Sequence, residues 1–199
     1  EHLVKAGIKT VLTREDDRDM ALFDRIGLAN RLAADVFVSL HLNATETPGP
    51  TGHETFFLSL EATDEAARRL AKLESADPTA VRAATRNVIE SDGVNDILLD
   101  LKRNQAHGDA QKLAAMIQER TTPQSPFKNR GVKQAPFFVL MGASMPAVVV
   151  EIGFINHRRE GKFITSDKGL RAMALGIAQG IIDFGQVVHA TRTEGSKTR

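Results

Sequence analysis

The segment Pro146–Ile152 (PAVVVEI) constrains the fold more than any other part of the 199-residue chain, because it is apolar almost throughout. A strand whose sheet is covered on both faces needs such a run, whereas a half-exposed strand alternates apolar and polar residues. Asp35–His41 (DVFVSLH) is a second short apolar segment and also predicts a strand. We therefore expect a layered α/β domain with at least one strand buried between two layers of helices.

The patterns around these two segments predict a mixed, mostly parallel sheet flanked by helices. Residues 8–14 are rich in β-branched side chains and follow Gly7, so they predict a strand. Helical spacing of apolar residues over 22–33 then leads to the strand at 35–41, which together make a βαβ unit. We expect further strands at 52–60 and 134–140, a loop at 123–131, and a closing helix that includes 170–181.

Residues 61–122 form a helical block inserted between strands. The block contains no aromatic residue, and its apolar side chains recur at helical spacing. We expect two to four helices here, with breaks at 91–93 (SDG) and 107–109 (HGD). The whole of 1–187 then makes one domain, and we expect residues 188–199 to be a disordered tail.

Composition excludes several classes of function. Lys and Arg number 26 against 25 Asp and Glu, so the net charge of +1 gives no general nucleic-acid footprint. No apolar run reaches the roughly 18 residues that a membrane-spanning helix needs. The chain has no Cys, which excludes thiol catalysis and Cys-ligated zinc. Any metal must therefore be held by His and carboxylate side chains.

His41 and Glu151 are the two polar residues that sit oddly, because each ends an apolar strand. Sites in open α/β sheets gather beyond the carboxyl ends of strands, so both residues point to one edge of the sheet. A neutral imidazole can bind zinc, and a carboxylate beside zinc-activated water can act as a general base. The alternative is a hydrogen-bonded core histidine and a salt-bridged glutamate.

Other polar residues offer weaker hypotheses. Arg14 ends the 8–14 strand, while Arg25 and Asn30 lie on the following helix and could brace the loop at His41. Arg130 belongs to a basic loop, 128–133, that could attract a substrate carboxylate. Each of these also fits ordinary surface polarity. Five further histidines favour surface or structural roles, with His157 able to face the same edge as Glu151: His2, His53, His107, His157 and His189.

Five segments, taken in order, carry a resemblance to a known family: VLTREDD, RIGLANRLAADVFVSLHLNA, GHETFFLS, NRGVKQAPFFVL and MPAVVVEIGFIN. Together they resemble the zinc-dependent N-acetylmuramoyl-L-alanine amidases of bacterial cell-wall remodelling, over about residues 7–185. The resemblance implies a peptidoglycan substrate and hydrolysis of the amide between N-acetylmuramic acid and L-alanine. It also implies that His41 is a zinc ligand and that Glu151 is the catalytic glutamate.

The helical block resembles the insertion of division amidases, which covers the active site until an activator protein binds. On this basis we expect an acidic side chain of the block to reach the metal, with Glu90, Asp96 and Asp100 as the hypotheses. The resemblance further implies a role in daughter-cell separation and a periplasmic or extracellular location. Nothing in the residues indicates a nucleotide or nucleic-acid partner.

The family's first zinc histidine, in a Gly-His-Gly-Gly strand, and a glutamate ligand near the start of the next helix have no counterpart here. We therefore expect an N-terminally truncated catalytic domain with an exposed sheet edge, inactive by itself. Two other hypotheses stay open at this point. One is a non-catalytic fragment that binds peptidoglycan or a division partner, and the other is a related zinc peptidase.

Overall fold

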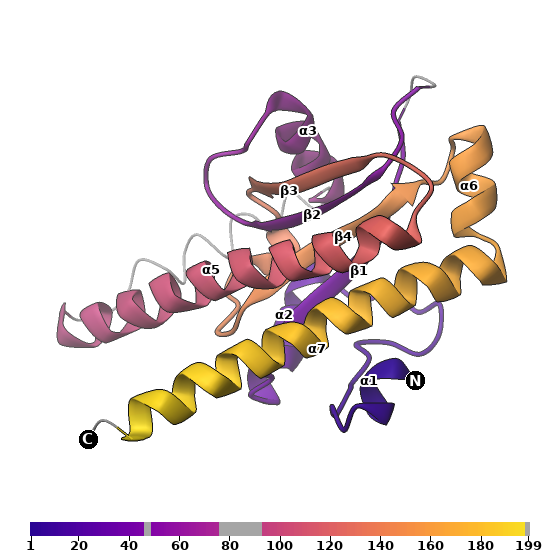
Figure 1. Ribbon diagram of the computed structural model, residues 1–199. Helices are drawn as coiled ribbons and strands as arrows, with labels where there is room; N and C mark the ends of the chain where they lie inside the picture. Colours follow the sequence, from indigo (N-terminus) through magenta and orange to yellow (C-terminus); the bar gives the residue numbers. More distant parts are fainter. Residues whose placement is uncertain (46–48, 76–92, 198–199) are drawn as a thin grey trace.

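The computed structural model describes residues 1–45, 49–75 and 93–197, with side chains described as far as 75 and again over 105–190. Its centre is a four-stranded sheet lying between two layers of helices (Figure 1). Helices α2 (Leu22–Arg31) and α3 (Glu65–Glu74) cover one face, and the long helices α5 (Gly93–Thr121) and α7 (Asp167–Lys197) cover the other. Short elements complete the described chain: α1 (His2–Lys5), α6 (Arg158–Ile164), and the 3-10 turns η1 (Thr122–Gln124) and η2 (Phe138–Leu140).

The sheet has the strand order β1-β4-β2-β3. Its strands are β1 (Phe37–Asn43), β2 (His53–Leu58), β3 (Asn129–Ala135) and β4 (Ala147–Phe154). Strand β4 pairs in parallel with β1, and β2 pairs in parallel with β3, while β2 and β4 are antiparallel. The expected mixed, mostly parallel sheet is confirmed, as are the strands expected within 35–41, 52–60 and 146–152.

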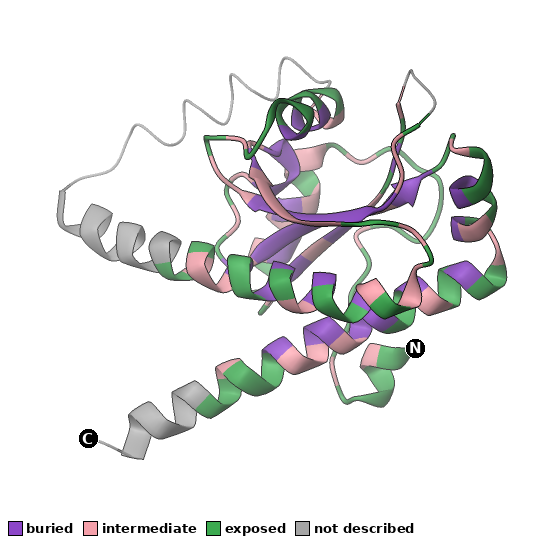
Figure 2. Cartoon of the chain, turned by 45° about the horizontal axis from the view of Figure 1, so that its top comes forward, coloured by how far each residue is buried: buried purple, intermediate pink, exposed green. Residues whose placement is uncertain are grey.

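Burial in β4 explains its apolar sequence. Val149 packs in the core on the α2 and α3 side, whereas Val148 and Val150 pack in the core on the α5 and α7 side. Both faces of the strand are therefore covered, and Figure 2 shows the central strands and the inner faces of α5 and α7 as buried. Such two-sided burial is what selects an unbroken run of valines.

Helices α5 and α7 cross closely because α7 carries glycine at the contact. A Cβ atom added to Gly180 would lie 2.5 Å from the Cα of Ile117, and one added to Gly176 would lie 2.7 Å from the carbonyl oxygen of Arg120. Neither position has room for a side chain. The small residues let the α5 backbone approach α7, and this pair supports the sheet from below the site.

The expected strand at 8–14 is wrong. These residues belong to no helix or strand, and in the described chain no strand pairs with them. A β-branched sequence favours extended backbone, but a strand needs a neighbour to satisfy its N–H and C=O groups. The βαβ unit is therefore absent, and β1 forms an edge of the described sheet.

Three other expectations need correction. The strand expected at 134–140 is shifted, because β3 ends at Ala135, where Pro136 cannot donate to the ladder, and residues 138–140 form η2. The break expected at 107–109 is absent because α5 runs through Gly108. Helix packing overrides the weak helix propensity of that glycine. Finally, α7 continues to Lys197, so most of the expected disordered tail is helical.

Within the described part of the chain, no helix combines the length and the apolar character that crossing a bilayer requires.

Candidate active site

His41 and Glu151 lie side by side in the sheet. Their Cα atoms are partners in the parallel pairing of β1 with β4, so the register itself brings the two side chains together. The expectation that the two residues lie together is confirmed, but neither ends its strand, because β1 continues to Asn43 and β4 to Phe154. A parallel ladder with this register places an imidazole beside a carboxylate without any contribution from a loop.

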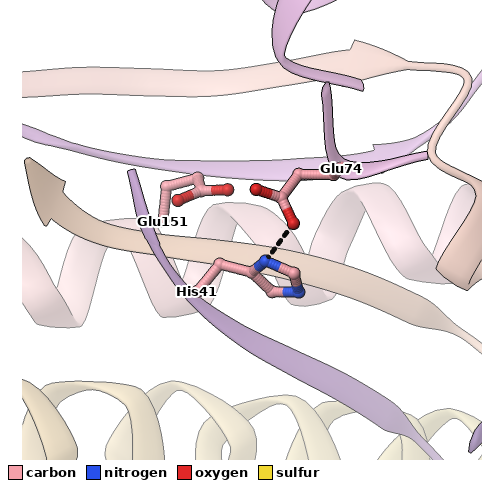
Figure 3. Close-up of side chains that lie close together, drawn as sticks. All are labelled: His41, Glu74 and Glu151. Carbon is pink, nitrogen blue, oxygen red and sulfur yellow. Dashed lines mark ion pairs between the residues drawn. The ribbon is translucent and has the colours of Figure 1, made fainter. Parts of the chain in front are cut away.

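Helix α3 adds a third residue to this pair. The carboxylate oxygen Oε2 of Glu74 lies 2.7 Å from Nδ1 of His41 (Figure 3). The helix is held by its own amphipathic pattern, because Ala67, Leu70 and Ala71 are buried against the core below it. These contacts bring the C-terminal end of α3, and with it Glu74, over the edge of the sheet.

Glu151 is fully buried, and neither of its carboxylate oxygens has a hydrogen-bond partner in the described structure. Burial raises the pKa of this carboxyl to about 8, and the negative charges of Glu74 and Glu54 add to the effect. Native proteins rarely leave a buried carboxylate without donors, and when they do the group usually serves a ligand or a reaction.

The three side chains form a group that can hold a metal ion. One ligand atom each from His41, Glu74 and Glu151 lie within 4.8 Å of one another. Figure 3 shows the Glu151 carboxylate directed towards Glu74, which in turn faces His41. One imidazole and two carboxylates are donors that zinc accepts, and the unpaired oxygens of Glu151 are the ones a cation would neutralise.

A second carboxylate, Glu54, stands next to this group on β2. Its Cα is the antiparallel partner of Glu151, and its side chain is 3% exposed. Arg130 Nε and Lys133 Nζ each donate to Glu54 Oε2 at 3.0 Å. Lys133 also pairs with Asp64, which caps the start of α3. The charge of Glu54 is thus balanced, unlike that of Glu151.

This network places Arg130 close to the site but already engaged with Glu54. The guanidinium also lies over the ring of Phe154, 5.3 Å from its centroid. Arg130 therefore braces the strands around the site in this structure.

The other expected site residues spread more widely. Arg25 lies near enough to Glu74 to help lower the pKa of that carboxyl, although its Nε donates to the carbonyl of Met20. Asn30 does not brace the loop at His41, which is a correction, because it bonds Gly142 O and Ser144 N of the loop before β4. Arg14 is exposed and bonds the carbonyl of Arg18.

Of the three acidic residues expected to reach the metal, Glu90 lies outside the described residues. Asp96 and Asp100 belong to α5, at positions where side chains are not described. Among the described side chains of the block, Glu74 lies at the site, and it was not among the residues expected from the sequence. A signal was available: Glu74 is in the last turn of its helix, where the helix dipole disfavours a negative charge.

The remaining histidines have structural surroundings. His157 caps α6, its Nδ1 accepting from the backbone N–H of Glu160 at 3.2 Å, and His107 packs edge-on against Phe57. His53 is 1% exposed, and neither ring nitrogen has a hydrogen-bond partner among the described residues. Burial lowers the pKa of the His53 imidazole below its ordinary value.

Comparisons with known proteins show the family of the chain. Residues 1–183 match the family model Amidase_3, described as N-acetylmuramoyl-L-alanine amidase. The chain is 30% identical to the N-acetylmuramoyl-L-alanine amidase AmiA of Escherichia coli K12 over 180 residues, 89% of this chain and 61% of AmiA. It thus spans about three-fifths of that relative.

Solved structures show the same fold. An N-acetylmuramoyl-L-alanine amidase from Clostridium difficile 630 superposes with a TM-score of 0.62 at 27% identity, covering 90% of this chain and 73% of that one. The CwlD amidase from Clostridioides difficile, solved in complex with the GerS lipoprotein, superposes with a TM-score of 0.62 at 21% identity. That likeness covers 93% of this chain and 79% of CwlD.

Proposed function

Because the chain belongs to the family of N-acetylmuramoyl-L-alanine amidases, we propose that it is the catalytic domain of a peptidoglycan hydrolase. The bond cleaved is the amide between the lactyl group of N-acetylmuramic acid and the L-alanine of the stem peptide. The observation that carries the proposal is the meeting of His41, Glu74 and a buried, unpaired Glu151. Peptidoglycan as substrate also supports a periplasmic or extracellular location and a role in daughter-cell separation.

In the resting protein His41 and Glu74 would hold the metal, for which zinc is the proposed identity, and Glu151 would lie beside it. A bound zinc ion supplies Lewis acidity that polarises an amide carbonyl and makes water more acidic. His41 is already oriented by two contacts, one through each ring nitrogen. Glu151 is free to change protonation state, because no donor in the described chain fixes its charge.

Glu151 would act as the proton carrier of the reaction. A general base works best when its pKa lies near the operating pH. Burial raises the pKa of Glu151 to about 8 in the metal-free chain, and a cation beside it would lower that pKa. As a carboxylate it would take the proton of the attacking water, and as an acid it would return that proton to the leaving amine of L-alanine. Glu54 lies opposite Glu151 and stays paired with two cations, so it would hold the strand without sharing that proton.

Glu74 supports the proposal that the helical block regulates the site. It comes from the first helix of block 61–122 and occupies Nδ1 of His41, the side of the ring that faces the other carboxylates. We propose that α3 covers the site in the resting protein and that a division-associated activator displaces it. The hypotheses for Glu90, Asp96 and Asp100 concern side chains outside the described ones. Among the described side chains of the block, Glu74 is the one proposed to block the site.

The first test is the zinc content of the purified chain after dialysis against micromolar zinc. About one tightly held ion per chain supports a metal site at His41. A His41→Ala variant and an exposed control, Glu61→Gln, locate the ion. Loss of zinc in both variants alike, or its retention in both, would contradict the assignment to His41.

The second test is product analysis with purified muropeptides, using the chain with any natural flanking sequence restored and zinc added. An amidase releases peptides that begin with a free L-alanine amine. A related peptidase would instead leave the lactyl-alanine amide intact. A binding module would sediment with cell-wall sacculi and release nothing, and either result would overturn the proposed reaction.

Glu74→Gln tests the regulatory proposal in the same assay, with Glu65→Gln on the exposed side of the same helix as its control. If Glu74 blocks the site, its variant raises basal activity while the control leaves it unchanged. Lower activity together with weaker zinc binding would instead make Glu74 a metal ligand that the reaction requires, and would sink the blocking role.

A further inference from the structure

His41 is held through both nitrogens of its ring, in two different directions. Nδ1 faces Glu74 at 2.7 Å, on the side where the three side chains gather. On the opposite side of the ring, Nε2 lies 3.0 Å from the hydroxyl oxygen of Ser39. The first contact belongs to the site already described, whereas the hydroxyl contact has no role in it so far.

The contact between the Ser39 hydroxyl and the His41 ring follows from the geometry of β1. Residues two apart in a strand project from the same face, so Ser39 and His41 stand next to each other. Ser39 is 7% exposed, and β1 is fixed there by its pairing with β4. The backbone that carries the hydroxyl is therefore fixed beside His41, and in this rotamer the hydroxyl hydrogen can still rotate.

Rotation of the Ser39 hydroxyl hydrogen matters because a neutral imidazole carries a single N–H, on either Nδ1 or Nε2. When Nδ1 donates to an ionised Glu74, Nε2 has a lone pair and needs a donor. When Nδ1 gives its lone pair to a metal, Nε2 carries the hydrogen and needs an acceptor. A serine hydroxyl can be either, since it has one O–H and two lone pairs. A backbone carbonyl or a carboxylate could serve the second state alone.

We propose that Ser39 is a positioning residue of the metal site, whose hydroxyl supports the His41 tautomer that turns the Nδ1 lone pair towards the metal. The inference rests on the proposed function, because it requires metal at this site. On loading, the Nδ1 proton leaves to solvent and Nε2 takes one up, so His41 stays neutral. The Ser39 hydroxyl keeps its own proton and reverses the direction of one hydrogen bond.

The test titrates Zn²⁺ alone into the purified chain by calorimetry, comparing the parent with Ser39→Ala and Ser39→Thr. Loss of an outer partner of a ligating histidine typically weakens metal binding about 10- to 100-fold, and we expect Ser39→Ala to fall in that range. Ser39→Thr keeps the hydroxyl and should restore most of the affinity. Thr55→Val is the matched control, because it removes a buried hydroxyl on β2, two strands away, that bonds Gln118 instead.

Nitrogen-15 NMR of the His41 ring supplies a readout that a general packing role would not move. We expect hydrogen on Nε2 in the zinc-loaded parent and on Nδ1 in the metal-free parent. Thr55→Val should reproduce both spectra even if it lowers the melting temperature. Zinc binding by the parent with unchanged affinity in Ser39→Ala, or hydrogen on Nδ1 in the loaded parent, overturns the inference alone. A parent that binds no zinc overturns the metal site as well.

Discussion

Two fully buried glutamates, Glu151 and Glu160, lie at the same end of the molecule and have opposite surroundings. The carboxylate of Glu160 accepts the backbone N–H of Gly52 at both oxygens, at 2.9 and 3.1 Å, and also bonds the backbone of Phe154. The carboxylate of Glu151 has no partner among the described residues. Both groups have lost their water, but only Glu160 has replaced it.

The difference separates a structural carboxylate from the one that we propose takes part in the reaction. Glu160, on α6, ties the start of β2 to the end of β4, and a Cβ atom on Gly153 would lie 2.8 Å from its Oε1, so the fit is close. Glu151 makes no such link, and no hydrogen bond from the described residues offsets the free-energy cost of burying its carboxylate. A fold keeps an arrangement of that kind where something else is to bind.

The largest expected effect is on catalysis by Glu151→Gln. Removing a general base typically costs about 10²- to 10⁴-fold in rate, so cleavage of muropeptides should fall by that factor. The stability of the metal-free variant should stay the same or rise, because an unpaired carboxyl has been replaced by a neutral amide. Muropeptide turnover and chemical denaturation measure the two quantities. A variant that retains parental turnover would remove Glu151 from the reaction.

Glu160→Ala should show the reverse pattern. It leaves buried backbone N–H groups of β2 and β4 without acceptors, and we expect the free energy of unfolding to fall by about 2–3 kcal/mol. Turnover per folded molecule, measured well below the unfolding transition, should change much less than in Glu151→Gln. If Glu160→Ala were as stable as the parent, the structural role drawn from its hydrogen bonds would be wrong.

The pH dependence of stability sharpens the same contrast. The pKa of Glu151 is raised from an ordinary value of 4.5 to about 8, so the folded chain binds this proton more tightly than the unfolded chain does. The contribution of this proton to the free energy of unfolding is complete below pH 4.5 and is lost as pH rises through 8. Unfolding of the metal-free chain between these limits should therefore become easier with rising pH. Glu151→Gln should remove that trend, and an identical slope in both proteins would contradict the assignment.

The smallest effect is expected at His53, a buried residue on β2. Its titration lowers stability at acidic pH, whereas that of Glu151 lowers stability at alkaline pH. Burial lowers its pKa below the ordinary 6.5, so the folded chain resists its protonation. The associated stability is present above pH 6.5 and declines as pH falls towards the lowered pKa. Replacing His53 with Leu should reduce the loss of unfolding free energy at acidic pH. The loss at alkaline pH that Glu151 causes should remain. Denaturation series at several pH values resolve the two losses.

The sequence by itself determined the central strands and the two residues on which the site is built. The unbroken valines of β4 could be read locally, because two-sided burial leaves its mark on every position of the strand. His41 and Glu151 stood out as polar residues that were expected to end apolar strands, although both strands continue beyond them. The strand expected at 8–14 failed because β-propensity is local, whereas a ladder needs a partner that propensity does not supply.

Only the tertiary structure decided which acid joins them. Glu74 is 33 positions from His41 in the chain, and its approach depends on how α3 packs against the core through Ala67, Leu70 and Ala71. The same is true of Glu54, whose place opposite Glu151 follows from the antiparallel register of β2 and β4. Helix placement and strand register are sums of many weak long-range contacts, so no short segment encodes them. The residue types were therefore predictable from sequence, but the assembly of the site required the fold.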